Sequence, residues 1–190
     1  ALDKIRMLVG KDLVPLAKDY QVTIWKSQGK KHKGWPGNVI EHYLGLPRNS
    51  AQSPNFGSWE LKVASLKYCK KGLVVKETMA ITMIDPYNVL QQPFESSHLL
   101  AKLQKMVVPA RVFVDVRETS SILYSVGAFD LSEQHIYETV KRDYELVRRV
   151  IRERGFDALS GSMGELVQPR TKGSGHGSTS RAFYARKRFV

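Results

Sequence analysis

The sequence has 190 residues, enough for one domain, or for one domain with a small lobe, around a substantial apolar core. No apolar run approaches the length of a membrane span, and the first residues do not resemble a signal peptide, so we expect a soluble protein with no membrane partner. The single cysteine, Cys69, excludes an internal disulfide and a multi-cysteine zinc site, and we expect it to be structural filler in a reducing cytoplasm.

The charge is strongly basic and unevenly distributed. Thirty Lys and Arg residues against eighteen Asp and Glu residues give a net charge of +12. Residues 166–190 contain six basic residues and no acidic one, and a second basic cluster lies within residues 26–33. Such a charge distribution attracts polyanions and predicts a nucleic acid as the partner. A basic surface that only aids solubility, or a disordered tail, is the alternative.

The first third of the chain is predicted to be largely helical. Residues 1–20 have apolar residues at helical spacing, with a break or kink at Pro15, and the polar residues 27–33 read as a loop. Residues 33–45 predict a short helix that begins near Pro36 and ends at Gly45, with Glu41 at the edge of its buried face. Glu41 is either an ordinary solvated carboxylate or a residue that orders a lysine or a metal-bound water.

Residues 53–63 carry the most informative pattern. Because side chains alternate along a strand, Glu60 and Lys62 should project to one side, while Leu61 and Val63 point into the core. A carboxylate and an ammonium so placed, just after the turn at Pro54, can hold a divalent cation and a water beside a phosphate. This is the chemistry of a nuclease.

The same residues resemble the signature of the PD-(D/E)xK nucleases, with Asn55 at the position of the aspartate and Glu60 and Lys62 at the other two. Together with Lys33-Gly34-Trp35, Gly37, Glu41 and Leu44-Gly45 upstream, they resemble the opening of the MutH family. That family comprises the strand-nicking endonuclease of bacterial mismatch repair and related restriction enzymes that cut at GATC. The resemblance implies an α/β, restriction-endonuclease-like fold, in which a central mixed sheet is flanked by helices and two lobes surround a DNA cleft.

The resemblance also implies a set of catalytic residues: Glu41, Asn55, Glu60, Lys62 and Lys102. Lys102 is included because residues 94–103 resemble the family's Glu-Thr-Ser-His segment and the helix after it; a solvated lysine on an amphipathic helix is the alternative. Mg²⁺ would be held by the residue at position 55, by Glu60 and by the carbonyl of Leu61. Lys62 would orient or deprotonate the attacking water, and Glu41 and Lys102 would support the site.

Asn55 departs from the family pattern. An amide oxygen lacks the charge of a carboxylate, so Mg²⁺ should bind more weakly. Three explanations compete: an engineered substitution that traps a DNA complex, a homologue that has lost cleavage, or an alignment in which another residue takes the role. The survival of Glu41, Glu60, Lys62 and Lys102 favours the first.

The middle of the chain supplies further elements. Residues 74–84 are apolar on both faces and predict a central strand, followed by a turn at residues 85–88. Residues 110–117 and 122–128 predict an antiparallel hairpin. A long scaffold helix is expected from about residue 132 to residue 154, with a capping box of Asp130 and Glu133 at its start and Gly155 at its end.

The C-terminal region, about residues 165–190, is the second informative region. Residues 168–180 are too rich in glycine for a regular element, and residues 181–186 resemble the closing strand of the family. Because such loops in relatives enter the major groove, the resemblance implies that this region reads DNA. A flexible linker with only phosphate contacts is the alternative. The candidate DNA-binding residues are Lys33, Arg170, Lys172, Gly173, Arg181, Tyr184 and Arg186.

We therefore expect one nuclease domain over residues 1–190, with its catalytic region at about 33–105. Its function would be sequence-specific, Mg²⁺-dependent cleavage of double-stranded DNA, with GATC as the site that the resemblance suggests. We expect it in the bacterial cytoplasm, associated with the nucleoid, with room for further domains or for repair or restriction partners. The alternative is a non-cleaving DNA-binding or effector module of the same fold; an RNA-binding protein is disfavoured because an interleaved aromatic platform is missing.

Overall fold

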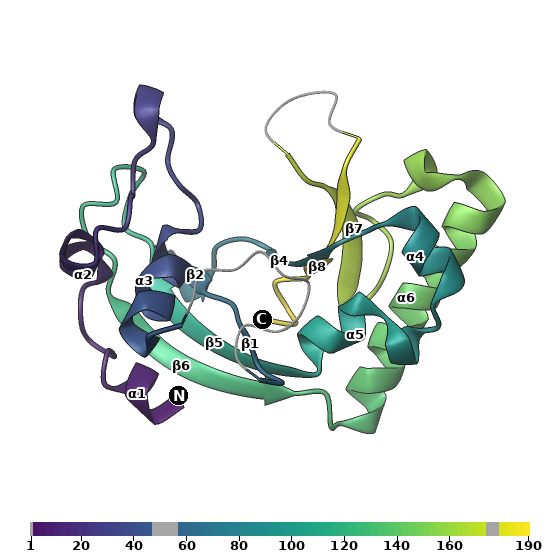
Figure 1. Cartoon of the computed structure of the whole chain (residues 1–190), viewed down its shortest axis with the longest axis horizontal. Helices are drawn as coiled ribbons and strands as arrows, with labels where there is room; N and C mark the ends of the chain where they lie inside the picture. The colour runs from purple at the N-terminus through teal and green to yellow at the C-terminus, as the bar shows by residue number, and fades with distance from the viewer. Residues whose placement is uncertain (1, 47–56, 174–178) are drawn as a thin grey trace. The chain divides into compact units, whose positions relative to one another are not determined.

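The computed structural model describes residues 2–46, 57–173 and 179–190 (Figure 1). These residues form two compact units. The first comprises the described residues up to Lys76 together with Met106–Phe129, and the second comprises Glu77–Lys105 and the described residues from Asp130 onward. Neither unit is a continuous segment of the chain.

The first unit is built on a mixed β-sheet. Strands β1 (Glu60–Leu61) and β2 (Ala64–Cys69) both pair in parallel with β5 (Lys105–Val112), with Glu60 opposite Met106 and Ala64 opposite Ala110. Because the offset is the same in both pairs, β1 and β2 form one line along β5 that is interrupted at residues 62–63. Strand β3 (Gly72–Val75) pairs antiparallel with β2, and β6 (Leu123–Asp130) pairs with β5.

Three helices supply the apolar side chains that pack against this sheet: α1 (Leu2–Arg6), α2 (Leu13–Asp19) and α3 (Trp35–Leu44). A short 3₁₀ turn, η1 (Ser27–Gly29), lies between α2 and α3. The shared core consists of Ile5, Leu8, Leu13, Ala17, Val22, Trp35, Val39, Ile40, Leu61, Val107 and Leu123. Leu61 thus fixes the strand that carries Glu60 against the helices.

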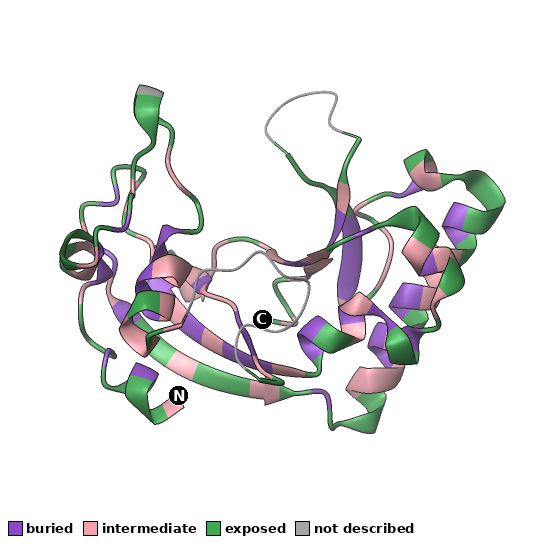
Figure 2. Cartoon of the chain, viewed as in Figure 1, coloured by how far each residue is buried: buried purple, intermediate pink, exposed green. Residues whose placement is uncertain are grey.

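The second unit has a three-stranded antiparallel sheet in the order β4 (Met79–Met83), β8 (Arg181–Ala185), β7 (Val167–Thr171). Its helical elements are α4 (Pro86–Gln91), η2 (Phe94–Ser96), α5 (His98–Leu103), α6 (Gln134–Arg154) and η3 (Phe156–Ala158). The ring of Tyr144 on α6 lies 5.7 Å from that of Phe94 and 5.9 Å from that of Phe183, so it joins the helices to the sheet. Figure 2 shows buried residues along β7 and on one side of α6.

The N-terminal helix breaks at a different residue from the one predicted. The chain leaves α1 and turns at Gly10, whose φ is +84°, before α2 begins at Leu13. Pro15 lies in the first turn of α2, where its missing N–H has no helical acceptor to lose. The predicted break at Pro15 is therefore wrong, whereas the helix at residues 33–45 is confirmed, with Gly45 at its C-cap in the left-handed region at a φ of +75°.

The predicted central strand at residues 74–84 is also wrong. Its two halves belong to different sheets, as β3 and β4, and each half lies at the edge of its sheet. The turn predicted at residues 85–88 is the start of α4, because the Asp85 carboxylate accepts hydrogen bonds from the backbone N–H groups of Tyr87 (2.9 Å) and Asn88 (3.2 Å).

The predicted hairpin is confirmed, but its first strand is shifted. Strand β5 spans Lys105–Val112, and the apolar residues Val114 and Val116 beyond it are exposed. The pairing with β6 is antiparallel, since the Val112 N–H donates to the Ile122 carbonyl at 2.8 Å while Gly127 lies beside the Val108 carbonyl. Residues 168–171, predicted to be irregular, belong to β7.

The long helix is confirmed as α6, which ends before Gly155, but its capping box is not. Glu133 is the N-cap residue without a side-chain hydrogen bond, and the Asp130 carboxylate instead accepts from the Ser132 N–H. Cys69 is exposed at the end of β2 and is therefore not core filler. Among the described residues, no helix has the length and apolar character needed to cross a membrane.

Candidate active site

Glu60 and Lys62 meet on the strand line that runs along β5. The Glu60 carboxylate lies 2.8 Å from the Lys62 ammonium; the Glu60 side chain is 1% exposed and that of Lys62 is 28% exposed. The line stays attached to β5 across its interruption, because the Lys62 N–H donates to the Val107 carbonyl at 3.1 Å. The prediction that both side chains project to one side is confirmed, and a buried carboxylate is thereby held beside a partly solvated cation.

Helix α3 lies beside this line. A Cβ placed on Gly37 would be 4.0 Å from the side chain of Val63, so the face of α3 that carries Gly37 packs next to the strand. Glu41 follows Gly37 by four residues and therefore lies on the same face, one turn further on. Its side chain is half-buried, as predicted for a residue at the edge of the buried face.

The other two predicted catalytic residues, Lys102 and Asn55, do not belong to the described part of the first unit. Lys102 lies on α5 in the second unit, where its side chain is 8% exposed. Asn55, with Pro54, lies outside the described residues. The catalytic roles of Lys102 and Asn55 stay predictions.

The residues implied as metal ligands fit Mg²⁺ in their chemistry. Glu60 offers a buried carboxylate and Leu61 a backbone carbonyl, and oxygen ligands of these two kinds are those that Mg²⁺ takes. The part of the chain that the structure describes contains no group of three or more His, Cys, Asp or Glu residues that could form a complete protein-only site. Mg²⁺ usually keeps several waters or phosphate oxygens in its shell, so one carboxylate and one carbonyl are compatible with it.

The predicted DNA-reading residues of the second unit lie on and around the β7–β8 hairpin. The exposed Arg170 donates to the Thr78 hydroxyl at 2.8 Å, and its guanidinium lies 5.6 Å from the centre of the Tyr184 ring. Arg181 donates to the Thr171 hydroxyl at 3.2 Å. Lys172 is exposed and extends the hairpin, since its N–H donates to the Ser180 carbonyl at 2.9 Å. Arg170 and Tyr184 thus form one surface pair, with Arg181 across the hairpin.

Three further residues of the DNA-binding prediction have different surroundings. Gly173 has a φ of +139°, at the last described position before residues 174–178. Lys33 is exposed in the first unit, just before α3. The guanidinium of Arg186 donates to four backbone carbonyls, those of residues 161–164, at 3.0–3.1 Å. This last arrangement stabilises the turn before β7, so Arg186 is better suited to structure than to contact with DNA.

Sequence reasoning did not find the aspartate that fixes this same turn. The buried Asp143 carboxylate on α6 accepts hydrogen bonds from the backbone N–H groups of Glu165 (2.6 Å), Leu166 (2.8 Å) and Val167 (2.8 Å). A signal was present, because an acid beside Tyr144 on the apolar stripe of an amphipathic helix has to find buried donors. Asp143 therefore holds the start of β7 on α6.

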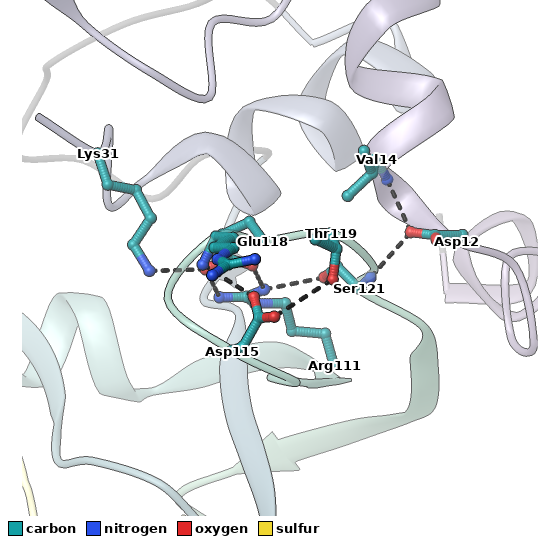
Figure 3. Close-up of polar contacts among 9 residues, drawn as sticks. Asp12, Val14, Lys31, Arg111, Asp115, Glu118, Thr119 and Ser121 are labelled. Carbon is teal, nitrogen blue, oxygen red and sulfur yellow. Dashed lines mark hydrogen bonds and ion pairs between the residues drawn. The ribbon is translucent and has the colours of Figure 1, made fainter. Parts of the chain in front are cut away.

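A second unpredicted feature is a buried ionic network in the first unit, shown in Figure 3. Arg111 on β5 donates both terminal nitrogens to the Glu118 carboxylate, and Lys31 donates to the same carboxylate at 2.7 Å. Arg111 also reaches the Ser121 hydroxyl at 2.9 Å. Burial by itself would raise the pKa of the Glu118 carboxyl, but the hydrogen bonds from Arg111 and Lys31 outweigh it and hold that pKa below its ordinary value.

A mixed sheet flanked by helices, with a Glu-Leu-Lys segment whose strand pairs in parallel with β5, defines a restriction-endonuclease-like fold. Residues 44–140, about half of the chain, match the family model described as "DNA mismatch repair enzyme MutH". The chain belongs to the MutH family.

Individual relatives agree with this assignment. The chain is 26% identical to the DNA mismatch repair protein MutH of Vibrio campbellii over 190 residues, which cover 96% of this chain and 80% of that protein. It is 25% identical to MutH of Shewanella woodyi over 154 residues, which cover 80% of this chain and 66% of that protein. It is also 26% identical to the type II restriction enzyme Sau3AI of Staphylococcus aureus over 163 residues, 82% of this chain but only 33% of the enzyme. The chain thus spans about a third of the length of Sau3AI.

Proposed function

We propose that this protein is a sequence-specific, Mg²⁺-dependent endonuclease for double-stranded DNA, acting in the bacterial cytoplasm. The observation that carries the proposal is the pairing of the buried Glu60 with Lys62 at 2.8 Å on a strand line fixed to β5. Membership of the MutH family, whose name refers to DNA mismatch repair, supports the substrate class. The net charge of +12 supports a polyanionic partner.

The chain's own residues divide the chemistry between them. Glu60 and the Leu61 carbonyl would hold the cation, and Lys62 would position the attacking water or take its proton. When bound, Mg²⁺ would polarise the phosphate and stabilise the charge that develops on it. Glu41, one turn along α3 from the strand contact, would orient Lys62 or a water. Lys102 keeps the supporting role that the family resemblance implies.

Sequence recognition is assigned to the β7–β8 hairpin. Arg170 has the planar donors that match a guanine edge, and its guanidinium lies 5.6 Å from the centre of the Tyr184 ring. Lys172, Gly173 and Arg181 would follow the adjacent phosphates, with Lys33 doing the same in the first unit. GATC is the site to test first, because it is the site that the family resemblance suggests.

Asn55 supports a second candidate function, a non-cleaving DNA-binding module of the same fold that acts with repair or restriction partners. An amide in place of the aspartate removes one negative charge from the cation site. The retained Glu41, Glu60 and Lys62 favour instead an inactivated form of a cleaving enzyme.

The test compares the chain with its Asn55→Asp variant on a supercoiled plasmid that contains GATC sites, with Mg²⁺ or with EDTA. Restoring the carboxylate is expected to raise Mg²⁺-dependent cleavage by on the order of 10²-fold or more, and sequencing the new ends gives the site. Tight, specific binding of the plasmid by the variant without cleavage in Mg²⁺ would establish the module instead. Absence of both binding and cleavage would refute both functions.

A further inference from the structure

Residues 24–32 of the first unit form a small projecting hairpin, which we call the basic arm. Trp25 and Lys31 form an antiparallel bridge, the Lys26 N–H donates to the Lys30 carbonyl at 2.7 Å, and the His32 N–H donates to the Ile24 carbonyl at 2.8 Å. The 3₁₀ turn η1 closes its tip. In Figure 1 this tip extends beyond α3. The arm therefore has a defined backbone that can present side chains at a distance from the sheet.

The arm carries only positive charge. Three lysines, Lys26, Lys30 and Lys31, lie in nine residues, and no acid is present. Lys26 and Lys30 are exposed, and they flank the tip on opposite strands of the hairpin. Trp25, which is 43% exposed, lies next to them. Two exposed ammonium groups at the end of a hairpin would repel each other, and an anionic ligand relieves that repulsion.

The third lysine anchors the arm to the buried network of Figure 3. The Lys31 ammonium lies 2.7 Å from the Glu118 carboxylate and 4.9 Å from the centre of the Phe113 ring. Glu118 is itself held by Arg111, which belongs to β5. This contact is buried on the Glu118 side, so salt screens it less than a surface ion pair. The arm is therefore fixed at its base while its tip remains in solvent.

We propose that the basic arm binds the phosphate backbone of double-stranded DNA, with Lys26 and Lys30 each neutralising one phosphate. Lysine ammonium groups act as point charges without the planar donors that read bases, so the contact adds affinity without sequence preference. The inference rests on the proposed function, which supplies duplex DNA as the ligand. It assigns a role to residues 24–32, which lie outside the segment that matches the MutH family model.

The test is the salt dependence of binding to a duplex that contains GATC and to one that lacks it. Each phosphate contact contributes about 0.9 to the slope of log K against log salt. Lys26→Ala/Lys30→Ala should therefore make the slope about 1.8 less steep, and at 0.1 M salt it should weaken binding to both duplexes by up to about 60-fold. The control is Lys11→Ala/Lys18→Ala, which removes the same charge from exposed lysines at and before α2 and should change the slope by well under 1.

A second variant examines the anchor. Lys31→Met keeps an unbranched side chain of similar length but removes the ammonium that contacts Glu118 and the Phe113 ring, and it should weaken DNA binding at least fivefold through loss of the arm's position. An unchanged slope for the arm variant, or equal losses for the arm and control variants, would overturn the proposal. If the arm variant binds DNA with an unchanged salt slope but the Asn55→Asp chain still cleaves DNA, the proposed function stands and only the role of the arm is refuted. If the unaltered chain binds no DNA, both fail together.

Discussion

The buried network around Glu118 allows a stability prediction that can be worked from its geometry. Glu118→Gln keeps the size of the side chain but removes the charge that faces Arg111, which is 5% exposed, and Lys31. Breaking a buried ion pair by removing one partner costs about 3–5 kcal/mol, because the other charge stays buried without compensation. Glutamine retains one acceptor oxygen, so we expect a loss of about 3 kcal/mol, or a fall of about 6–12 °C in the Tm of a chain of this size.

The same carboxylate should make stability depend on pH. The pKa of Glu118 in the folded state is lowered, so its stabilising contribution is complete above the ordinary glutamate pKa of about 4.3 and is lost as the pH falls through the lower folded-state value. Urea unfolding at pH 7 and at successively lower pH gives the free energy of unfolding at each pH. On acidification, this free energy should fall less for the Glu118→Gln variant than for the unaltered chain.

The matched control replaces both partners. The double variant Arg111→Met/Glu118→Leu removes both charges of the pair, so neither position keeps a buried charge without its partner. It should therefore recover most of the unfolding free energy that Glu118→Gln loses. A loss below about 1 kcal/mol for Glu118→Gln, or a double variant as unstable as the single one, would refute the assignment of this pair as a coupled buried network.

Two further predictions concern the site and the turn before β7. In the aspartate-restored chain, Lys62→Met should lower the cleavage rate by about 10²-fold or more, whereas Lys67→Met, at an exposed position of β2, should leave it unchanged; equal rates would remove Lys62 from the reaction. Gly164→Ala should cost about 3 kcal/mol or more in urea unfolding, because φ is +77° and a Cβ would lie 1.9 Å from the Val167 carbonyl oxygen. Gly161→Ala meets the flexible Arg170 side chain at 3.3 Å and the Gln168 side chain at an ordinary contact distance of 3.8 Å, and it should cost less than about 1 kcal/mol; similar losses for both variants would contradict the steric reasoning.

The features that sequence predicted correctly depend on residues close together in the chain. The two-residue repeat of a strand places Glu60 and Lys62 on one side whatever sheet the strand joins. The ends of α3 and α6 follow from Gly45 and Gly155, whose backbone conformations at φ of +75° and +85° end a helix locally. Local rules therefore sufficed for the candidate site and for the helix C-termini.

The features that sequence missed depend on distant partners. Whether residues 74–84 form one strand or two is decided by pairing with β2 in one sheet and with β8 in the other. The Lys31–Glu118 contact joins residues 87 positions apart, and Asp143 accepts from N–H groups 22–24 positions away. Asp143 leaves an indirect trace in the sequence, as an acid on the apolar stripe of α6, whereas Glu118 lies in the connection between two strands, where an acid is ordinary.

Strand β5 connects the candidate site with the anchor of the basic arm. Met106 lies opposite Glu60, and Arg111 is five residues further along the same strand, a distance of about 17 Å at the usual rise of 3.3 Å per residue. A paired strand of this length is stiff, so loosening the arm should leave Glu60 in place. In the aspartate-restored chain below its Tm, Glu118→Gln should therefore raise KM for DNA and leave kcat unchanged, the opposite of the effect expected for Lys62→Met. A fall in kcat at constant KM would mean that the network positions the reacting groups through β5 rather than the DNA through the arm.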